Sequence, residues 1–218
     1  MDGSVAQQHI SLRRLSVQQA TSVVERSHAR LCFVLVLLSL VCFLPGFASL
    51  QPMDRDEPRY AQASKQMLET GDFVDIRFQD EARHKKPVGI YWMQSASVAI
   101  GGALGVSEAH TTIALYRLPS LFGAIATVLL TYWAALAFFG RRGAFLVAAL
   151  MATSVILMVE ARLAKTDAML AACSVAVMGG LARAYFSRGA GVLPRRALLI
   201  FWTGFALGVL IKGPVILM

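Results

Sequence analysis

Long stretches of apolar side chains recur along this chain of 218 residues. About 20 consecutive apolar residues are needed for a helix to cross the hydrocarbon core of a bilayer. Stretches that approach this length predict membrane-spanning helices at residues 31–50, 117–139, 143–161, 168–187 and 197–214. The sequence therefore predicts an all-α polytopic membrane protein.

The first apolar stretch follows a polar leader. Residues 1–30 carry several arginines, among them Arg13, Arg14, Arg26 and Arg30, and we expect them to form a cytoplasmic tail. A secretory signal has a shorter apolar core and a shorter charged lead, so residues 31–50 are interpreted as an uncleaved anchor. Because the chain stops at Ile216-Leu217-Met218, inside or just after a helix, we expect it to be the N-terminal part of a longer protein.

Basic turns give the orientation of the predicted helices. Arginines near membrane helices favour the cytoplasmic side, and they occur in two turns, Arg141-Arg142 and Arg188 with Arg195-Arg196. If residues 31–50 cross outward, both turns return to the cytoplasm only when residues 88–106 do not span. We therefore expect residues 51–116 to form a long outer loop, with 88–106 as a re-entrant or surface helix.

The formal charge of +8 does not indicate a nucleic-acid partner, because 56% of the residues are apolar and most of the arginine flanks apolar stretches. There it would orient helices and contact anionic membrane lipids. The cysteines, Cys32, Cys42 and Cys173, all fall inside apolar stretches and are expected to be small core residues. No disulfide or zinc signature is visible.

The densest cluster of charge is Asp54-Arg55-Asp56-Glu57-Pro58-Arg59-Tyr60, directly after the first apolar stretch. Pro58 suits the first position of a helix and Gly71 suits its end, so the pattern predicts a short helix over 58–70. The positive end of such a helix favours an ionised carboxylate, which a general base must be. Asp56 is thus a candidate base. An equally weighted interpretation makes Asp56 or Glu57 only a helix cap.

The predicted topology brings other ionisable residues to the same outer face. They are Glu160, Arg162, Lys165 and Asp167 in the second outer loop, and Lys212 at the end of the last helix. Charges so close to hydrocarbon are costly and tend to be functional. The alternatives are a snorkelling side chain for Lys212 and a structural ion pair between Arg162 and Asp167.

Five motifs in order resemble one family. They are Asp56-Glu57-Pro58-Arg59-Tyr60-Ala61, Gly71-Asp72 after Met67, Lys86-Pro87 with Tyr91-Trp92, Arg162 with Thr166-Asp167, and Lys212-Gly213-Pro214. Together they are similar to the N-terminal part of membrane glycosyltransferases of the aminoarabinose-transferase and protein-mannosyltransferase type, which have the GT-C fold. The resemblance covers roughly residues 31–218. It implies GT-C-like transmembrane helices and a first outer loop that carries short juxtamembrane helices.

The resemblance also implies a reaction and its partners. A sugar would leave a polyprenyl-phosphate donor at the periplasmic face of a bacterial inner membrane and pass to lipid A, other lipopolysaccharide or a protein. Asp56 would be the general base and Asp167 a second catalytic acid. The residues expected to bind substrate or the lipid phosphate, mostly through positive charge, are Arg59, Tyr60, Lys86, Arg162 and Lys212.

One departure from the family concerns metal binding. Members of the aminoarabinose type carry an acid just before the Lys-Pro pair, and that acid can contribute to a metal site. Here Lys85 stands there, and His84 beside two lysines is a poor ligand, so no cofactor and no metal ligands are assigned. A different class, a transporter that uses Asp167 and Lys212 as coupling groups, would favour internal repeats, and none is visible. A scaffold without catalysis leaves the first-loop charges unexplained.

Overall fold

The computed structural model describes residues 27–52, 54–187 and 195–217. The described part of the chain is mostly helical, with one pair of two-residue strands, which confirms the predicted all-α fold. Its elements are α2 (His28–Phe43), α3 (Glu57–Thr70), β1 (Arg77–Phe78), β2 (Glu81–Ala82), α4 (Gly89–Ala103), α5 (Ile113–Ala135), α6 (Arg141–Ala152), α7 (Val155–Glu160), α8 (Asp167–Phe186), α9 (Arg195–Lys212) and the 3₁₀ helix η2 (Gly213–Leu217). Most of the predicted tail, including Arg13, Arg14 and Arg26, lies outside the described residues, as does Arg188.

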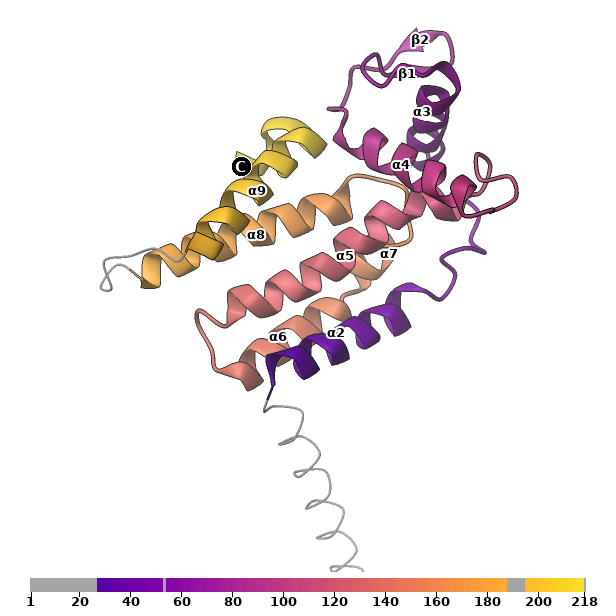
Figure 1. Ribbon diagram of the computed structural model, residues 1–218. Helices are drawn as coiled ribbons and strands as arrows, with labels where there is room; N and C mark the ends of the chain where they lie inside the picture. The colour runs from indigo at the N-terminus through magenta and orange to yellow at the C-terminus, as the bar shows by residue number, and fades with distance from the viewer. Residues whose placement is uncertain (1–26, 53, 188–194, 218) are drawn as a thin grey trace, which may run out of the picture.

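The long helices lie side by side and carry the shorter elements of the first loop at one end (Figure 1). Helix α5 contacts α2, α6 and α8, and α8 in turn contacts α9. Close packing depends on small residues, as is usual between helices in membranes. At Gly123 of α5, an added Cβ would lie only 2.8 Å from the backbone of Met169 in α8.

Three described helices are long and apolar enough to span a membrane, at Ile113–Ala135, Asp167–Phe186 and Arg195–Leu217. They fall where three of the spans were predicted. The helix predicted at 31–50 is shorter, because α2 ends at Phe43, just before Pro45 and Gly46. Proline restricts the residue before it, and Gly46 adopts a positive φ of 80°.

The continuous helix predicted at 143–161 is instead two helices, α6 and α7, interrupted at Thr153 and Ser154. The Thr153 hydroxyl donates to the carbonyls of Ala149 and Leu150 at 3.1 and 3.2 Å. Such bonding back to the preceding turn competes with the regular backbone ladder and often bends a helix. Whether this pair and α2 cross the membrane stays a prediction.

The first loop contains the two helices expected in it. Helix α3 covers Glu57–Thr70, with Pro58 in its first turn and Gly71 after it in the left-handed conformation at φ 71°. These are the start and stop signals that predicted a helix over 58–70, so that prediction is confirmed. Helix α4 covers Gly89–Ala103 within the predicted surface segment, and packs against α3 and α5.

Candidate functional site

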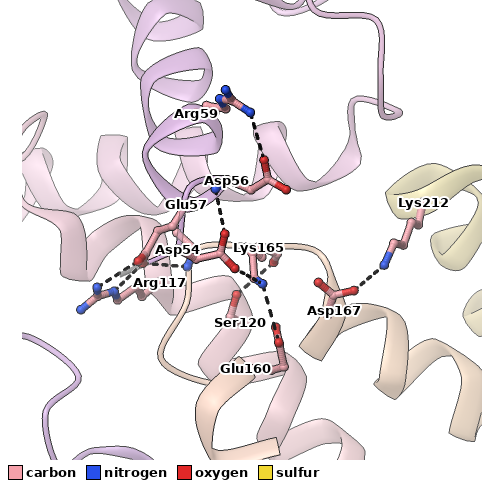
Figure 2. A network of polar contacts seen from close by, with 11 residues as sticks. Asp54, Asp56, Glu57, Arg59, Arg117, Ser120, Glu160, Lys165, Asp167 and Lys212 are labelled. Carbon is pink, nitrogen blue, oxygen red and sulfur yellow. Dashed lines mark hydrogen bonds and ion pairs between the residues drawn. The ribbon is translucent and has the colours of Figure 1, made fainter. Parts of the chain in front are cut away.

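A network of charged side chains occupies the end of the bundle where α3 meets the connection between α7 and α8 (Figure 2). It draws on four stretches that are far apart in the sequence: residues 54–59, Arg117 with Ser120, residues 160–167, and Lys212. The expected meeting of the first-loop acids with the second-loop charges is therefore present in the structure.

A buried ion pair lies at the base of this network. Glu57, in the first turn of α3, and Arg117, in α5, are 0% and 1% exposed. The guanidinium holds both carboxylate oxygens, with Nε to Oε1 at 2.7 Å and Nη2 to Oε2 at 3.2 Å. The backbone N–H of Ala164 also donates to Glu57 Oε1 at 3.0 Å. This bidentate contact fixes the start of α3 against α5 and the second loop.

The rest of the Arg117 guanidinium binds the chain that follows α2. Its Nη1 donates to the carbonyls of Phe47 and Leu50 at 2.7 and 2.9 Å. A buried charge is tolerated when it is paired and its remaining donors are satisfied, and both conditions hold here. The Glu57–Arg117 pair is therefore structural, and Glu57 is not available for proton transfer.

A second ion pair links the two loops directly. Lys165 Nζ lies 2.7 Å from Asp54 Oδ2 and 3.7 Å from Glu160 Oε1. Asp54 also accepts a hydrogen bond from the backbone N–H of Asp56, and this bond together with Lys165 lowers the pKa of Asp54. Burial alone would lower the pKa of Lys165, but the bond to Asp54 and the nearby acids outweigh it and raise that pKa.

Asp56 lies at the solvent side of the network. It occupies the position just before α3 but makes no side-chain cap hydrogen bond, so the helix-cap interpretation does not describe it. Its side chain is 52% exposed, and Arg59 Nη1 lies 3.4 Å from its Oδ1. Among the described residues, Arg59 is the only ion-pair partner of this carboxylate. Asp56 is thus the most accessible acid of the group.

Asp167, the first residue of α8, forms an ion pair with Lys212, the last residue of α9. The Arg162–Asp167 pair considered from the sequence is not formed. Pro87, the residue after Lys86, lies near the same place, because its ring is 3.8 Å from the Cβ position of Gly213. The structure therefore brings the Lys86-Pro87 turn and the Lys212-Gly213 turn together beside Asp167.

Tyr60 and Arg162 both make structural contacts with other parts of the chain. The Tyr60 ring is 4% exposed and packs on Tyr91, with ring centroids 5.4 Å apart. Burial raises the pKa of Tyr60 to about 12. Arg162 donates to the carbonyls of Phe43 and Cys42, at 3.2 and 2.6 Å, and so satisfies the C-terminal end of α2.

A cavity of about 540 Å³ opens beside the start of α3, on the side of the buried Glu57–Arg117 pair. Its volume is within the range of ligand sites in proteins. The residues that line it are Leu50, Gln51, Asp54, Arg55, Arg117, Val159, Arg162 and Leu163. Neither Asp56 nor Asp167 is among them.

The residues around Lys86 do not fit a metal ion. His84 Nε2 is 2.9 Å from Asp75 Oδ1, and the cationic Arg83, Lys85 and Lys86 surround it in the sequence. Within residues 27–52, 54–187 and 195–217, no three His, Cys, Asp or Glu side chains form a group that could hold a metal.

Sequence reasoning missed the partnership of Glu57 with Arg117 and that of Asp54 with Lys165. Arg117 was placed at the edge of a predicted span, whereas α5 begins at Ile113 and encloses it. A lone arginine inside an apolar helix was the available signal, because such a charge needs a partner. No comparable signal connects Asp54 to Lys165, which is 111 residues away.

The fold and the charged network at one end of the helical bundle define a polytopic membrane protein of the GT-C type. Residues 29–218 match the family described as Dolichyl-phosphate-mannose-protein mannosyltransferase, and the chain belongs to this family. The fold is also that of ArnT from Cupriavidus metallidurans. Its apo crystal structure superposes with a TM-score of 0.72 at 21% identity, covering 84% of this chain and 33% of that one.

Other relatives extend the comparison. ArnT bound to undecaprenyl phosphate superposes with a TM-score of 0.68 at 21% identity, over 88% of this chain and 34% of that one. The undecaprenyl phosphate-alpha-4-amino-4-deoxy-L-arabinose arabinosyl transferase of Pectobacterium carotovorum is 34% identical over 126 residues, 56% of this chain. An uncharacterised protein of Aquifex aeolicus is 31% identical over 184 residues, 84% of this chain. The chain spans 21% and 39% of these two relatives.

Proposed function

We propose that the chain forms part of an integral membrane glycosyltransferase. In this proposal a pentosyl or hexosyl sugar leaves a polyprenyl phosphate and passes to lipid A, other lipopolysaccharide or a protein. The observation that carries the proposal is the meeting of acids and cations from four distant stretches at one end of the bundle. Family membership supports it, as do the undecaprenyl-phosphate donor in the name of the Pectobacterium relative and the undecaprenyl phosphate bound to the Cupriavidus ArnT.

The proposed site faces the periplasm from a bacterial inner membrane. Helix α5 has 23 residues, and at a rise of about 1.5 Å per residue its ends lie roughly 35 Å apart. Arg117 near its start belongs to the charged network, and Arg141 and Arg142 open α6 just beyond its other end. Because arginines near helix ends favour the cytoplasm, this separation supports an outer position for the network.

Asp56 is the proposed general base. As the acceptor oxygen attacks the anomeric carbon of the sugar, its proton passes to the Asp56 carboxylate. The bond between that carbon and the phosphate oxygen breaks, and the polyprenyl phosphate departs with the electron pair. The exposure of Asp56, with Arg59 as its neighbour, leaves the carboxylate accessible to an acceptor.

Fixed cations stabilise the phosphate that leaves. Lys86 and Lys212 come from two turns that the Pro87–Gly213 contact brings together. Asp167 holds the Lys212 ammonium, which gives this second acid a positioning role beside the reacting groups. Arg59 contributes a further charge, while the buried Tyr60 ring packs α3 on Tyr91 of α4.

The test is sugar transfer by the full-length protein carrying Asp56→Asn. Transfer from a polyprenyl-phosphate donor is followed by the mass added to envelope lipids and surface proteins. Asp56→Asn removes the base and is expected to abolish transfer without reducing protein levels. Asp80→Asn, an identical change at an exposed position between β1 and β2, serves as the matched control. Wild-type transfer by Asp56→Asn eliminates Asp56 as the base.

Cysteine accessibility separates the transferase from the transporter. The 2.7 Å contact between Lys165 and Asp54 holds the two outer loops together at one end of the bundle, which favours a one-sided site. Cysteines at positions 56 and 167 should both be labelled by a membrane-impermeant reagent from the periplasmic side. Labelling from opposite sides contradicts the transferase and favours the carrier.

A further inference from the structure

The cavity beside the start of α3 contains positive charge that the surrounding residues do not neutralise. Three arginines and one acid line it: Arg55, Arg117, Arg162 and Asp54. Arg117 is balanced by the buried Glu57 carboxylate. Lys165 is shared by Asp54 and Glu160, so these three groups together leave one negative charge. The two positive charges of Arg55 and Arg162 exceed it.

Arg162 is anchored by neutral acceptors. It donates through Nε and Nη2 to the last carbonyls of α2, and a helix C-terminus supplies only about half a negative charge. A guanidinium has about five N–H donors, so the two bonds leave roughly three for a ligand. Arg55 is exposed and forms no ion pair with any described residue.

The other walls of the cavity are aliphatic. Leu50, Val159 and Leu163 line it together with the arginines. A free inorganic ion would gain nothing from these side chains, whereas an amphiphile would bury its apolar part against them. The cavity volume of about 540 Å³ accommodates more than a lone phosphate. Cationic and aliphatic walls together fit a phosphate that is attached to an apolar body.

We propose that this cavity binds the headgroup phosphate of an anionic membrane phospholipid, with Arg55 and Arg162 as its ligands. The site is distinct from the proposed transfer site, because neither Asp56 nor Asp167 lines the cavity. A lipid seated there contacts the chain that follows α2, the residues before α3, and α7. It therefore stabilises the junction of these elements without taking part in transfer.

The experiment measures thermal stabilisation of the full-length protein, purified in detergent and stripped of lipid. Dioleoylphosphatidylglycerol is expected to raise the apparent Tm in a saturable way, whereas dioleoylglycerol, with the same chains and no phosphate, is not. Arg55→Gln is expected to weaken phosphatidylglycerol binding about tenfold, the typical effect of one charge-assisted contact. Arg162→Gln should act in the same direction. Arg77→Gln, an equal charge change at another exposed arginine, should bind as the wild type does.

Several outcomes overturn the proposal. Equal stabilisation by dioleoylglycerol would show that the phosphate is not recognised. Full stabilisation by inorganic phosphate alone would show that the site binds a free anion and not a lipid. Unchanged phosphatidylglycerol binding by Arg55→Gln excludes this cavity as the lipid site. The Arg55→Gln result is decisive even if Arg162→Gln fails to fold. Asp56→Asn should lose sugar transfer but still bind phosphatidylglycerol. Transfer and lipid binding therefore test the proposed reaction and the lipid site independently.

Discussion

Removal of Arg117 tests the structural role of the buried ion pair. In Arg117→Met the Glu57 carboxylate loses two hydrogen bonds, at 2.7 and 3.2 Å, and remains fully buried with the Ala164 N–H as its neighbour. Breaking a buried pair from one side costs about 3–5 kcal/mol. The orphaned carbonyl of the buried Phe47 acts in the same direction, because an unsatisfied buried acceptor costs about 1–3 kcal/mol. The Leu50 carbonyl adds less, because that residue is 42% exposed.

The assay is reversible unfolding of the full-length protein in mixed micelles, with the free energy of unfolding compared among variants. Addition of Glu57→Gln to Arg117→Met removes the stranded charge and is expected to restore about 1–3 kcal/mol. Arg77→Gln breaks an exposed pair with Asp75 and should cost no more than about 1 kcal/mol. If Arg117→Met is no more destabilising than Arg77→Gln, the reasoning from burial is wrong.

Three further predictions follow from other contacts. The pKa of Asp54 is lowered in the folded state, so its contribution to stability is present above the unfolded value of about 3.9; the pKa of Lys165 is raised, so its contribution is present below about 10.4. The ion pair therefore stabilises the fold between these two pH values. Asp54→Asn should flatten the fall in apparent Tm as the pH drops below about 4. Gly123→Leu should cost about 1–3 kcal/mol, measured by the same unfolding assay, because its side chain meets the Met169 backbone, and Gly123→Ala should cost less. Lys212→Met should reduce transfer more than Lys212→Arg, measured as sugar added per protein, and equal losses would contradict a role for its charge.

Local sequence signals predicted the elements that depend on local chemistry. Helix α3 begins and ends where Pro58 and Gly71 indicated, because capping and backbone conformation are determined within a few residues. The break at Thr153 was not predicted, since the flanking residues are apolar and neither proline nor glycine marks the position. Hydrophobic periodicity measures burial and does not report hydroxyl bonding within a turn.

Candidate residues could be collected from the sequence, but their partners could not. The predicted topology put Asp167 and Lys212 on the same side of the membrane, and in the structure they form an ion pair although 45 positions separate them in the sequence. The same argument considered Asp167 with Arg162, which is nearer in the sequence but bonds instead to the end of α2. Ion pairing depends on how helices are arranged, and that arrangement follows from packing across the whole bundle.

The contacts of the connection between α7 and α8 determine when the first loop can finish folding during synthesis. Its residues bond to Glu57, Asp54 and the end of α2 across sequence separations of 107, 111 and 119. A ribosome that adds about 5–20 residues per second needs roughly 5–20 s to make 107 residues. During that interval α3 has emerged while its anchoring partners are still unsynthesised. The first loop therefore remains incompletely packed at the membrane surface until these residues are made. Insertion factors or proteases would encounter it during this interval.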